Sequence, residues 1–249
     1  MSTKTVKRPL TCSVFSREYW STAASEMKST RSLVFAALIV ALRVIVKLFK
    51  IPLAAGLVLS FDCYVNALGS IVYGPLMGLM VGAVSDTVGC AVEGFAGYFL
   101  PFILVEMSSS FIFGLFLWRR ELTVTRTISA KFFVNLFCNI ILTSIFVKWS
   151  MYFFTGADAA EAYNIINLVR VVKNLVLFPL EGVLIIMVLS AFLPALKSLN
   201  IIPKEQDKLV LTKKHIIFVI VCALLSVALV LFYIFYLKDF VKAHNIKLF

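Results

Sequence analysis

Charged residues are scarce in this sequence. Asp, Glu, Lys and Arg make up 15% of its 249 residues, whereas roughly 25% is usual in soluble globular proteins. Hydrophobic residues reach 61%, against about 45–50% in a soluble domain. This balance excludes an ordinary soluble protein and indicates a chain that crosses a membrane several times.

Acidic residues are the scarcer charged type, with 13 Asp and Glu against 24 Lys and Arg. The net charge of +11 would suggest nucleic-acid binding in a soluble protein. Here the basic residues gather in short connections between apolar segments, as the positive-inside rule describes. We therefore expect membrane lipids around this chain and no nucleic-acid partner.

Metal-binding, disulfide and catalytic patterns are missing too. The five cysteines are dispersed without CxxC spacing, and the two histidines are too far apart for an HExxH motif. No Walker A motif or DDxxD-like carboxylate cluster occurs, which argues against an ATPase and against a lipid-modifying transferase. We expect no metal, no cofactor and no enzymatic activity, so any use of ATP requires another subunit.

Long apolar segments dominate what is present. A spanning helix needs about 20 predominantly apolar residues. The candidates are Ser32–Phe49, Leu59–Tyr73, Pro75–Val92, Tyr98–Trp118, Ser129–Phe154, Asn164–Leu193 and His215–Leu237. The second and third are separated only by Gly74, so they should form an antiparallel hairpin. The predicted fold class is an all-α polytopic membrane protein.

Lys and Arg predict the orientation. Residues 1–30 are polar and basic and lack the apolar core of a signal peptide, so we expect a poorly ordered cytosolic tail. The connection after the fourth segment is also basic, with Arg119, Arg120, Arg126 and Lys131. Residues 197–214 form a third basic stretch, a cytosolic linker. An additional helix at 215–237 then leaves the tail, 238–249, outside.

Several ionisable residues fall within the spans, where they are costly and are functional candidates. With the N-terminus in the cytosol and a rise of about 1.5 Å per residue, the charges of six helices reach one level near the outer face. They are Arg43, Lys47, Asp62, Asp86, Glu106, Lys148, Arg170 and Lys173. We predict a polar cavity open to the outside. The alternative is ion pairing that holds the helices in register, for example Arg43 with Asp86 or Glu106.

The sixth segment carries a cationic face, because Arg170, Lys173 and Asn174 are three to four residues apart. Two cations and a carboxamide suit an anionic group beside a hydrogen-bonding heterocycle. The alternative is a basic helix end at the membrane interface. Glu181 lies deeper, after Pro179, where a structural role is open, and it is not included among the site residues.

Small residues follow two helix faces. Gly74, Gly78 and Gly82 precede Asp86 on one stripe, so that stripe should pack against another helix and direct Asp86 into the bundle. We expect Asp86 to hold a cation that shapes the cavity. Ala37 and Ala41 repeat the four-residue spacing on the first segment, which allows close approach of another helix.

Together these segments resemble the S components of energy-coupling factor (ECF) vitamin transporters, above all the folate type. The likeness covers about 31–196. It rests on Ser60-Phe61, Gly74-Pro75, Ala83-x-x-Asp86-x-x-Gly89, FLPFILVEMSSSFIFGLFLWRR, Arg170-x-x-Lys173-Asn174 with Pro179, and Ala37-x-x-x-Ala41. The chain departs from the family in its seventh helix, in Thr143-Ser144-Ile-Phe146 where Asn-Thr-x-Trp is common, and in the polar Asp62 and Asn66.

The resemblance implies a six-helix S-component bundle in a bacterial plasma membrane, here with an added seventh helix. It implies capture of a vitamin, folate or a related anionic one, from outside. The implied partner is an energising module of one transmembrane coupling subunit and two ATPase subunits, docked at Ala37 and Ala41, with transport by toppling. The predicted substrate-binding residues are Arg43, Asp62, Asp86, Glu106, Lys148, Arg170, Lys173 and Asn174. Alternatives are another vitamin or precursor, or a self-sufficient secondary transporter, for which we find no internal repeat.

Overall fold

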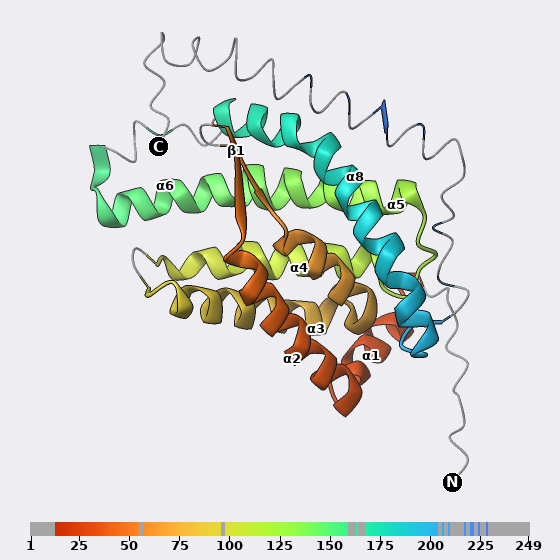
Figure 1. Ribbon diagram of the computed structural model, residues 1–249. Helices are drawn as coiled ribbons and strands as arrows, with labels where there is room; N and C mark the ends of the chain where they lie inside the picture. The colour runs from red at the N-terminus through yellow and green to blue at the C-terminus, as the bar shows by residue number, and fades with distance from the viewer. Residues whose placement is uncertain are drawn as a thin grey trace.

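The computed structural model describes residues 13–54, 57–95, 98–158 and 168–203, with single residues 163, 206, 209, 217, 220, 221, 224 and 228. Their elements are helical except for one small sheet (Figure 1). In order they are α1 Arg17–Glu26, α2 Thr30–Lys47, β1 Lys50–Ala54, β2 Leu57–Ser60, α3 Asp62–Val92, η1 Leu100–Phe102, α4 Ile103–Leu117, α5 Val124–Phe133, η2 Val134–Leu142, α6 Thr143–Phe154 and α8 Leu168–Ser198.

The predicted all-α membrane fold is confirmed. Four helices within the described residues are long and apolar enough to cross a membrane, or up to five if α1 and α2, which meet at a 73° bend, form one broken span. Most of the predicted seventh helix, 215–237, lies outside the described residues. The five positions described there are helical.

The chain reverses inside α3. Gly74 has φ 78° and ψ −174°, a backbone conformation that glycine adopts without the strain of a Cβ. In an unbroken helix Asp62 and Asp86 would lie about 36 Å apart. Instead they pair with Arg43 and Lys47, which are one turn apart on α2. The two halves of α3 therefore form the predicted antiparallel hairpin (Figure 1).

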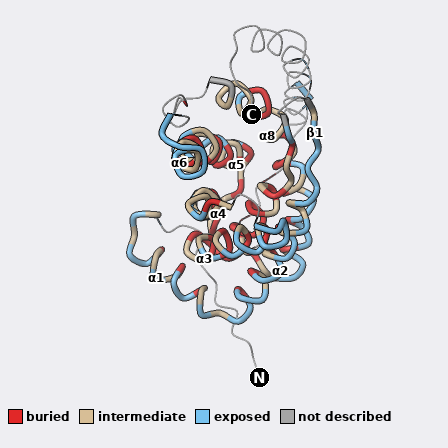
Figure 2. Tube along the Cα trace, turned by 90° about the vertical axis from the view of Figure 1, so that its left-hand side faces the viewer, coloured by how far each residue is buried: buried red, intermediate tan, exposed pale blue. Residues whose placement is uncertain are grey.

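The glycine stripe of α3 packs against α4, as predicted. A Cβ on Gly82 would lie 2.8 Å from the backbone oxygen of Glu106, and one on Gly78 would lie 3.1 Å from that of Ser110. Because these are backbone contacts, no side-chain rotation could make room. Buried residues accordingly concentrate where α3 and α4 meet, whereas the outer side of α2 is exposed (Figure 2).

The fifth predicted helix begins earlier than expected. Thr123 caps α5 by accepting a hydrogen bond from the backbone N–H of Arg126, and a nine-residue π-helix, η2, joins α5 to α6. Lys131 lies in α5, as the predicted span Ser129–Phe154 already implied, but it is buried and does not belong to an exposed basic connection. Counting Lys131 in the basic connection is wrong because a half-buried carboxylate, Glu181 of α8, pairs with it.

The N-terminal segment is also more ordered than predicted. Ser16 caps α1 by accepting a hydrogen bond from the backbone N–H of Tyr19. The Tyr19 ring meets the Trp118 ring edge-on, with centroids 5.0 Å apart, and Ala23 is fully buried beside them. This apolar contact orders residues 17–26, so the expectation of a poorly ordered tail is wrong there.

Two connections carry structure that the sequence analysis did not predict. β1 and β2 form an antiparallel hairpin between α2 and α3, with Lys50 opposite Ser60. After α8, the buried Gln206 donates a hydrogen bond to the carbonyl oxygen of Leu117 and its own carbonyl accepts from the N–H of Leu122. The predicted linker, 197–214, thus contacts the end of α4 through Gln206.

Candidate functional site

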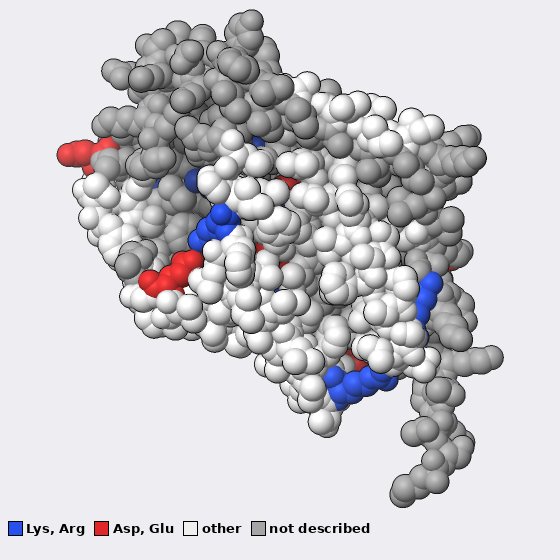
Figure 3. All heavy atoms as spheres, viewed as in Figure 1, with Lys and Arg blue, Asp and Glu red and all other residues white. Residues whose placement is uncertain are grey.

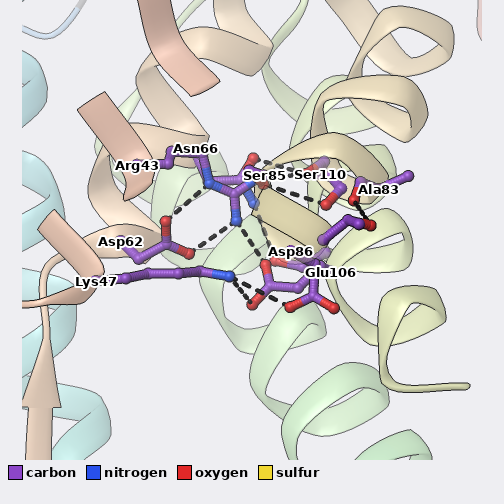
Figure 4. A network of polar contacts seen from close by, with 12 residues as sticks. Arg43, Lys47, Asp62, Asn66, Ala83, Ser85, Asp86, Glu106 and Ser110 are labelled. Atoms are coloured by element: carbon purple, nitrogen blue, oxygen red, sulfur yellow. Dashed lines mark hydrogen bonds and ion pairs between the residues drawn. The ribbon is translucent and has the colours of Figure 1, made fainter. Parts of the chain in front are cut away.

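Arg43 is the centre of a buried charge cluster (Figure 4). Its side chain, on α2, is 0% exposed. Nε and Nη2 donate to the two carboxylate oxygens of Asp62, each at 2.8 Å. Nη2 also donates to Glu106 of α4. A bidentate Arg–carboxylate pair fixes both direction and distance, so this contact joins α2 and α4 to the start of α3.

Lys47 extends this cluster by one helical turn. Its ammonium lies 3.4 Å from Asp86 and 3.4 Å from Glu106. The Tyr98 hydroxyl donates to the other oxygen of Asp86 at 3.4 Å. Two cations thus face three carboxylates, Asp62, Asp86 and Glu106. The cluster neutralises its own cations and has no surplus positive charge for an anionic ligand.

Neutral polar side chains complete the cluster between α3 and α4. The Ser110 hydroxyl donates to Asn66 Oδ1 at 2.8 Å, and Asn66 Nδ2 donates to Ser109 at 3.2 Å. Arg43 Nη1 donates to the Ser110 hydroxyl at 3.4 Å. Asn66, predicted only as a departure from the family, therefore positions the serine hydroxyl to which Arg43 donates.

The structure thus brings together four of the predicted site residues: Arg43, Asp62, Asp86 and Glu106. It does so by ion pairing between helices, which was the alternative interpretation. Asp86 does hold a cation, but the cation is Lys47 rather than Arg43.

The remaining predicted residues lie elsewhere. Asn174 Nδ2 donates to the carbonyl oxygen of Arg170, and Arg170 Nη2 donates to the Tyr163 hydroxyl at 3.3 Å. Among the described residues, no carboxylate lies within 4 Å of Lys148 or Lys173. Lys173, near the start of α8, therefore lies apart from the neutralised cluster around Arg43.

A second polar cluster was missed. Lys131 pairs with Glu181 at 3.1 Å and donates to the thiol of Cys63 at 3.2 Å. Asn135 Nδ2 donates to Glu181 at 3.2 Å, and Asn139 Nδ2 donates to Asn135 at 3.0 Å. A signal was available, because Lys131, Asn135 and Asn139 are spaced four apart and share a helix face. The positive-inside rule hid this shared face, because it assigned Lys131 to a basic connection on the cytosolic side.

Ala37 and Ala41 lie on the exposed side of α2. Their neighbours on that side are apolar and largely uncovered: Leu33, Val34, Leu38, Leu42 and Ile45 are 40–63% exposed. The face of the molecule formed by α2 and α8 is mostly uncharged, with charges near its edges (Figure 3). Among the described residues, no group of three or more His, Cys, Asp or Glu side chains is placed to hold a metal ion.

Comparisons with known proteins agree in outline. Residues 27–192 match a family model described as the S component of ECF-type riboflavin transporters. The folate transporter FolT of Clostridium novyi is 23% identical over 159 residues, which are 64% of this chain and 88% of the relative. FolT of Leuconostoc mesenteroides subsp. mesenteroides is 28% identical over 153 residues, 61% of this chain and 80% of the relative.

A solved structure is similar as well. The crystal structure of FolT bound with folic acid matches this fold with a TM-score of 0.51 at 26% sequence identity. The match covers 62% of this chain and 88% of the other. The other 38% of this chain falls outside the alignment.

Proposed function

Since this chain belongs to the ECF-type S-component family described for riboflavin transporters, we propose that it captures folate or a related anionic vitamin from outside a bacterial cell. It then passes the vitamin to an energising module of one transmembrane coupling subunit and two ATPase subunits. In this proposal the protein is a multi-pass subunit of the plasma membrane with a cytosolic N-terminus.

The charge distribution carries the choice of an anionic vitamin. Arg43 and Lys47 are neutralised by three carboxylates, so they offer little to another anion. Arg170 and Lys173 lie one turn apart at the start of α8, with the Asn174 carboxamide beside them. Folate has two carboxylates at one end and a hydrogen-bonding heterocycle at the other. We place its carboxylates at Arg170 and Lys173.

The relatives support folate in particular. Two are named folate transporters, and the related crystal structure holds folic acid. Riboflavin is the second candidate, because the matching family model is described by that vitamin. Riboflavin has no carboxylate, so the cationic end of α8 would then lack a charged partner in the ligand.

Calorimetry of the detergent-solubilised protein tests the proposal. Folic acid and riboflavin are titrated separately, with an unrelated neutral vitamin as control. Binding of folic acid, tighter than that of riboflavin, is the expected result. Binding of riboflavin alone would refute the choice of folate, and binding of neither would refute the proposal as a whole.

The exposed side of α2 is proposed to contact the energising module. Ala37 and Ala41 are the small residues of that side, and small side chains let two helices approach within backbone contact. The surrounding leucines and valines supply apolar area that is compatible with either lipid or a partner helix. Because the same apolar side of α2 can face either lipid or the module, the S component can dissociate from the module and bind it again without unfolding.

A further inference from the structure

Helix α1 lies outside the part of the chain that matches the family. It ends at Glu26, whereas the family model matches residues 27–192. Its 10 residues measure about 15 Å along the helix axis, half of the hydrocarbon thickness of a membrane, so α1 cannot span by itself. It meets α2 at a bend of 73°. A helix at this angle to a spanning neighbour runs closer to the membrane plane than to its normal.

The bend between α1 and α2 is held by polar contacts on both sides. Glu26, at the end of α1, is 5% exposed and accepts hydrogen bonds from Arg119 at 3.0 Å and from the Ser32 hydroxyl at 2.8 Å. Just after the bend, Arg31 donates to the two carbonyl oxygens that follow α8, at 2.9 and 3.0 Å. Helix α1 therefore cannot swing into line with α2 without losing these contacts.

The inner side of α1 packs on Trp118, the residue that follows α4. The Tyr19 ring meets the indole edge-on, and the Tyr19 hydroxyl donates to the carbonyl oxygen of Gly114 at 3.5 Å. The indole in turn lies on the turn of the α3 hairpin, because a Cβ on Gly74 would be 2.7 Å from it. Helix α1 thus covers the end of the bundle where α2 begins and α8 ends (Figure 1).

Two aromatic side chains of this region suit the membrane interface. The Trp20 ring stacks on Phe111 of α4, with centroids 6.1 Å apart, while its Nε1 donates to the carbonyl oxygen of Val14 at 2.9 Å. An apolar ring against a spanning helix, with a polar edge beside a loop, is the arrangement that tryptophan adopts at headgroup level. Phe15 is 97% exposed, so its ring gains free energy by leaving water for lipid.

The exposed charge of α1 and the bend is mainly positive. The exposed ionisable side chains of residues 17–31 are Arg17, Lys28 and Arg31, against Glu18 alone. Glu26 is buried and paired, so it does not offset them. Anionic lipid headgroups are the complementary surface, and each Lys or Arg beside such a surface strengthens binding about fivefold.

We propose that α1 and its bend bind the lipid surface of the membrane. Phe15 and Trp20 enter the headgroup layer, and Arg17 and Lys28 pair with anionic headgroups. Because the bend is held by the ends of α4 and α8, this contact fixes the tilt of the whole bundle. Only the side of the membrane, the cytosolic one, is taken from the proposed function.

Fluorescence quenching tests the depth of Trp20. The full chain carrying Trp149→Phe is reconstituted in phosphatidylcholine vesicles brominated either near the headgroup or near the end of the acyl chain. Trp118 is 2% exposed, so the quenched signal comes from Trp20. Quenching should be stronger with bromine near the headgroup, and adding Trp20→Phe should abolish it. Absence of quenching, or stronger quenching from the chain end, overturns the proposal.

Hydrogen exchange of the α1 amides tests the lipid charge. In wild type, adding phosphatidylglycerol to phosphatidylcholine vesicles should slow exchange of residues 17–26 about fivefold or more. The double variant Arg17→Gln, Lys28→Gln should lose most of this effect. Lys50→Gln, which removes an exposed cation after the other end of α2, should keep it. Equal exchange in the two kinds of vesicle overturns the proposal without any variant.

Two further outcomes are distinguishable. If α1 is protected only when the energising module is reconstituted with it, α1 belongs to the module's docking surface and the lipid contact is wrong. Neither experiment uses a vitamin. A chain that binds neither folic acid nor riboflavin would therefore refute the proposed function and leave the lipid contact of α1 standing on its own measurements.

Discussion

Arg43 and Asp62 form two parallel hydrogen bonds across the β1–β2 hairpin. Both are 2.8 Å long, and both groups are almost fully buried. The hairpin leaves α2 a few residues after Arg43 and returns to α3 directly before Asp62. The ion pair therefore joins the two helices between which the β1–β2 hairpin is inserted.

Arg43→Met should destabilise the protein strongly. The substitution leaves Asp62 and Glu106 as buried carboxylates without their common cation, a loss that typically costs about 3–5 kcal/mol. Thermal unfolding in detergent, without ligand, measures it. Lys50→Met is the control, because Lys50 pairs with Glu93 at an exposed position, where the expected cost is below about 1 kcal/mol. Equal melting temperatures for the two variants would contradict the central role of Arg43.

Arg170→Ala should weaken ligand binding without unfolding the bundle. A charge-assisted hydrogen bond contributes about 1.5–3 kcal/mol, so affinity for folic acid should fall at least tenfold. Lys197→Ala removes the same charge from the other end of α8 and should leave affinity unchanged. Calorimetry compares both with the wild type. The assignment fails if Arg170→Ala binds folic acid normally, or if Lys197→Ala loses as much.

Gly82→Ala should separate α3 from α4. The new methyl group would lie 2.8 Å from the carbonyl oxygen of Glu106, and such overpacking typically costs about 1–3 kcal/mol. Gly182→Ala in α8 is the control, since nothing lies within 4 Å of its added carbon. There the better helix propensity of alanine should stabilise by up to about 1 kcal/mol. Melting temperatures that move in the same direction for both would refute the close-packing argument.

Ala37→Trp and Ala41→Trp should block assembly with the energising module. A large ring on the exposed side of α2 prevents close helix approach, yet it disturbs no buried contact of the bundle. Leu175→Trp introduces the same ring at an exposed position of α8 and should not interfere. Co-purification of the module's subunits with each variant is the measurement. Normal recovery with both alanine variants would place the docking surface elsewhere.

The apolar pattern predicted most of the fold, because each span has to satisfy its backbone hydrogen bonds internally and be apolar over a membrane's thickness. The hairpin at Gly74 followed from the same reasoning. The β1–β2 hairpin and α1 did not, since both depend on tertiary contacts. α1 is ordered by Trp118, which lies about a hundred residues further along the chain.

The candidate site was predicted in part. Depth along each helix identified Arg43, Asp62, Asp86 and Glu106 as neighbours, since helix direction and rise determine depth. Depth does not determine rotation about the helix axis, so the pairing of Asp86 with Lys47 could not be foreseen. Lys131 shows a second limit, because the sequence pattern around a lysine near the end of a span is the same whether the lysine faces water or a carboxylate of another helix.

The cluster around Arg43 is built only from residues 43–110, so the first half of the chain neutralises its own buried charges. Helices α2, α3 and α4 can therefore associate during synthesis before α5 to α8 have left the ribosome, consistent with the tendency of N-terminal units to fold first. Lys131, by contrast, pairs with Glu181 only after α8 is made. Order of synthesis thus separates the charge cluster that the first half of the chain completes alone from the one that must wait for the last described helix.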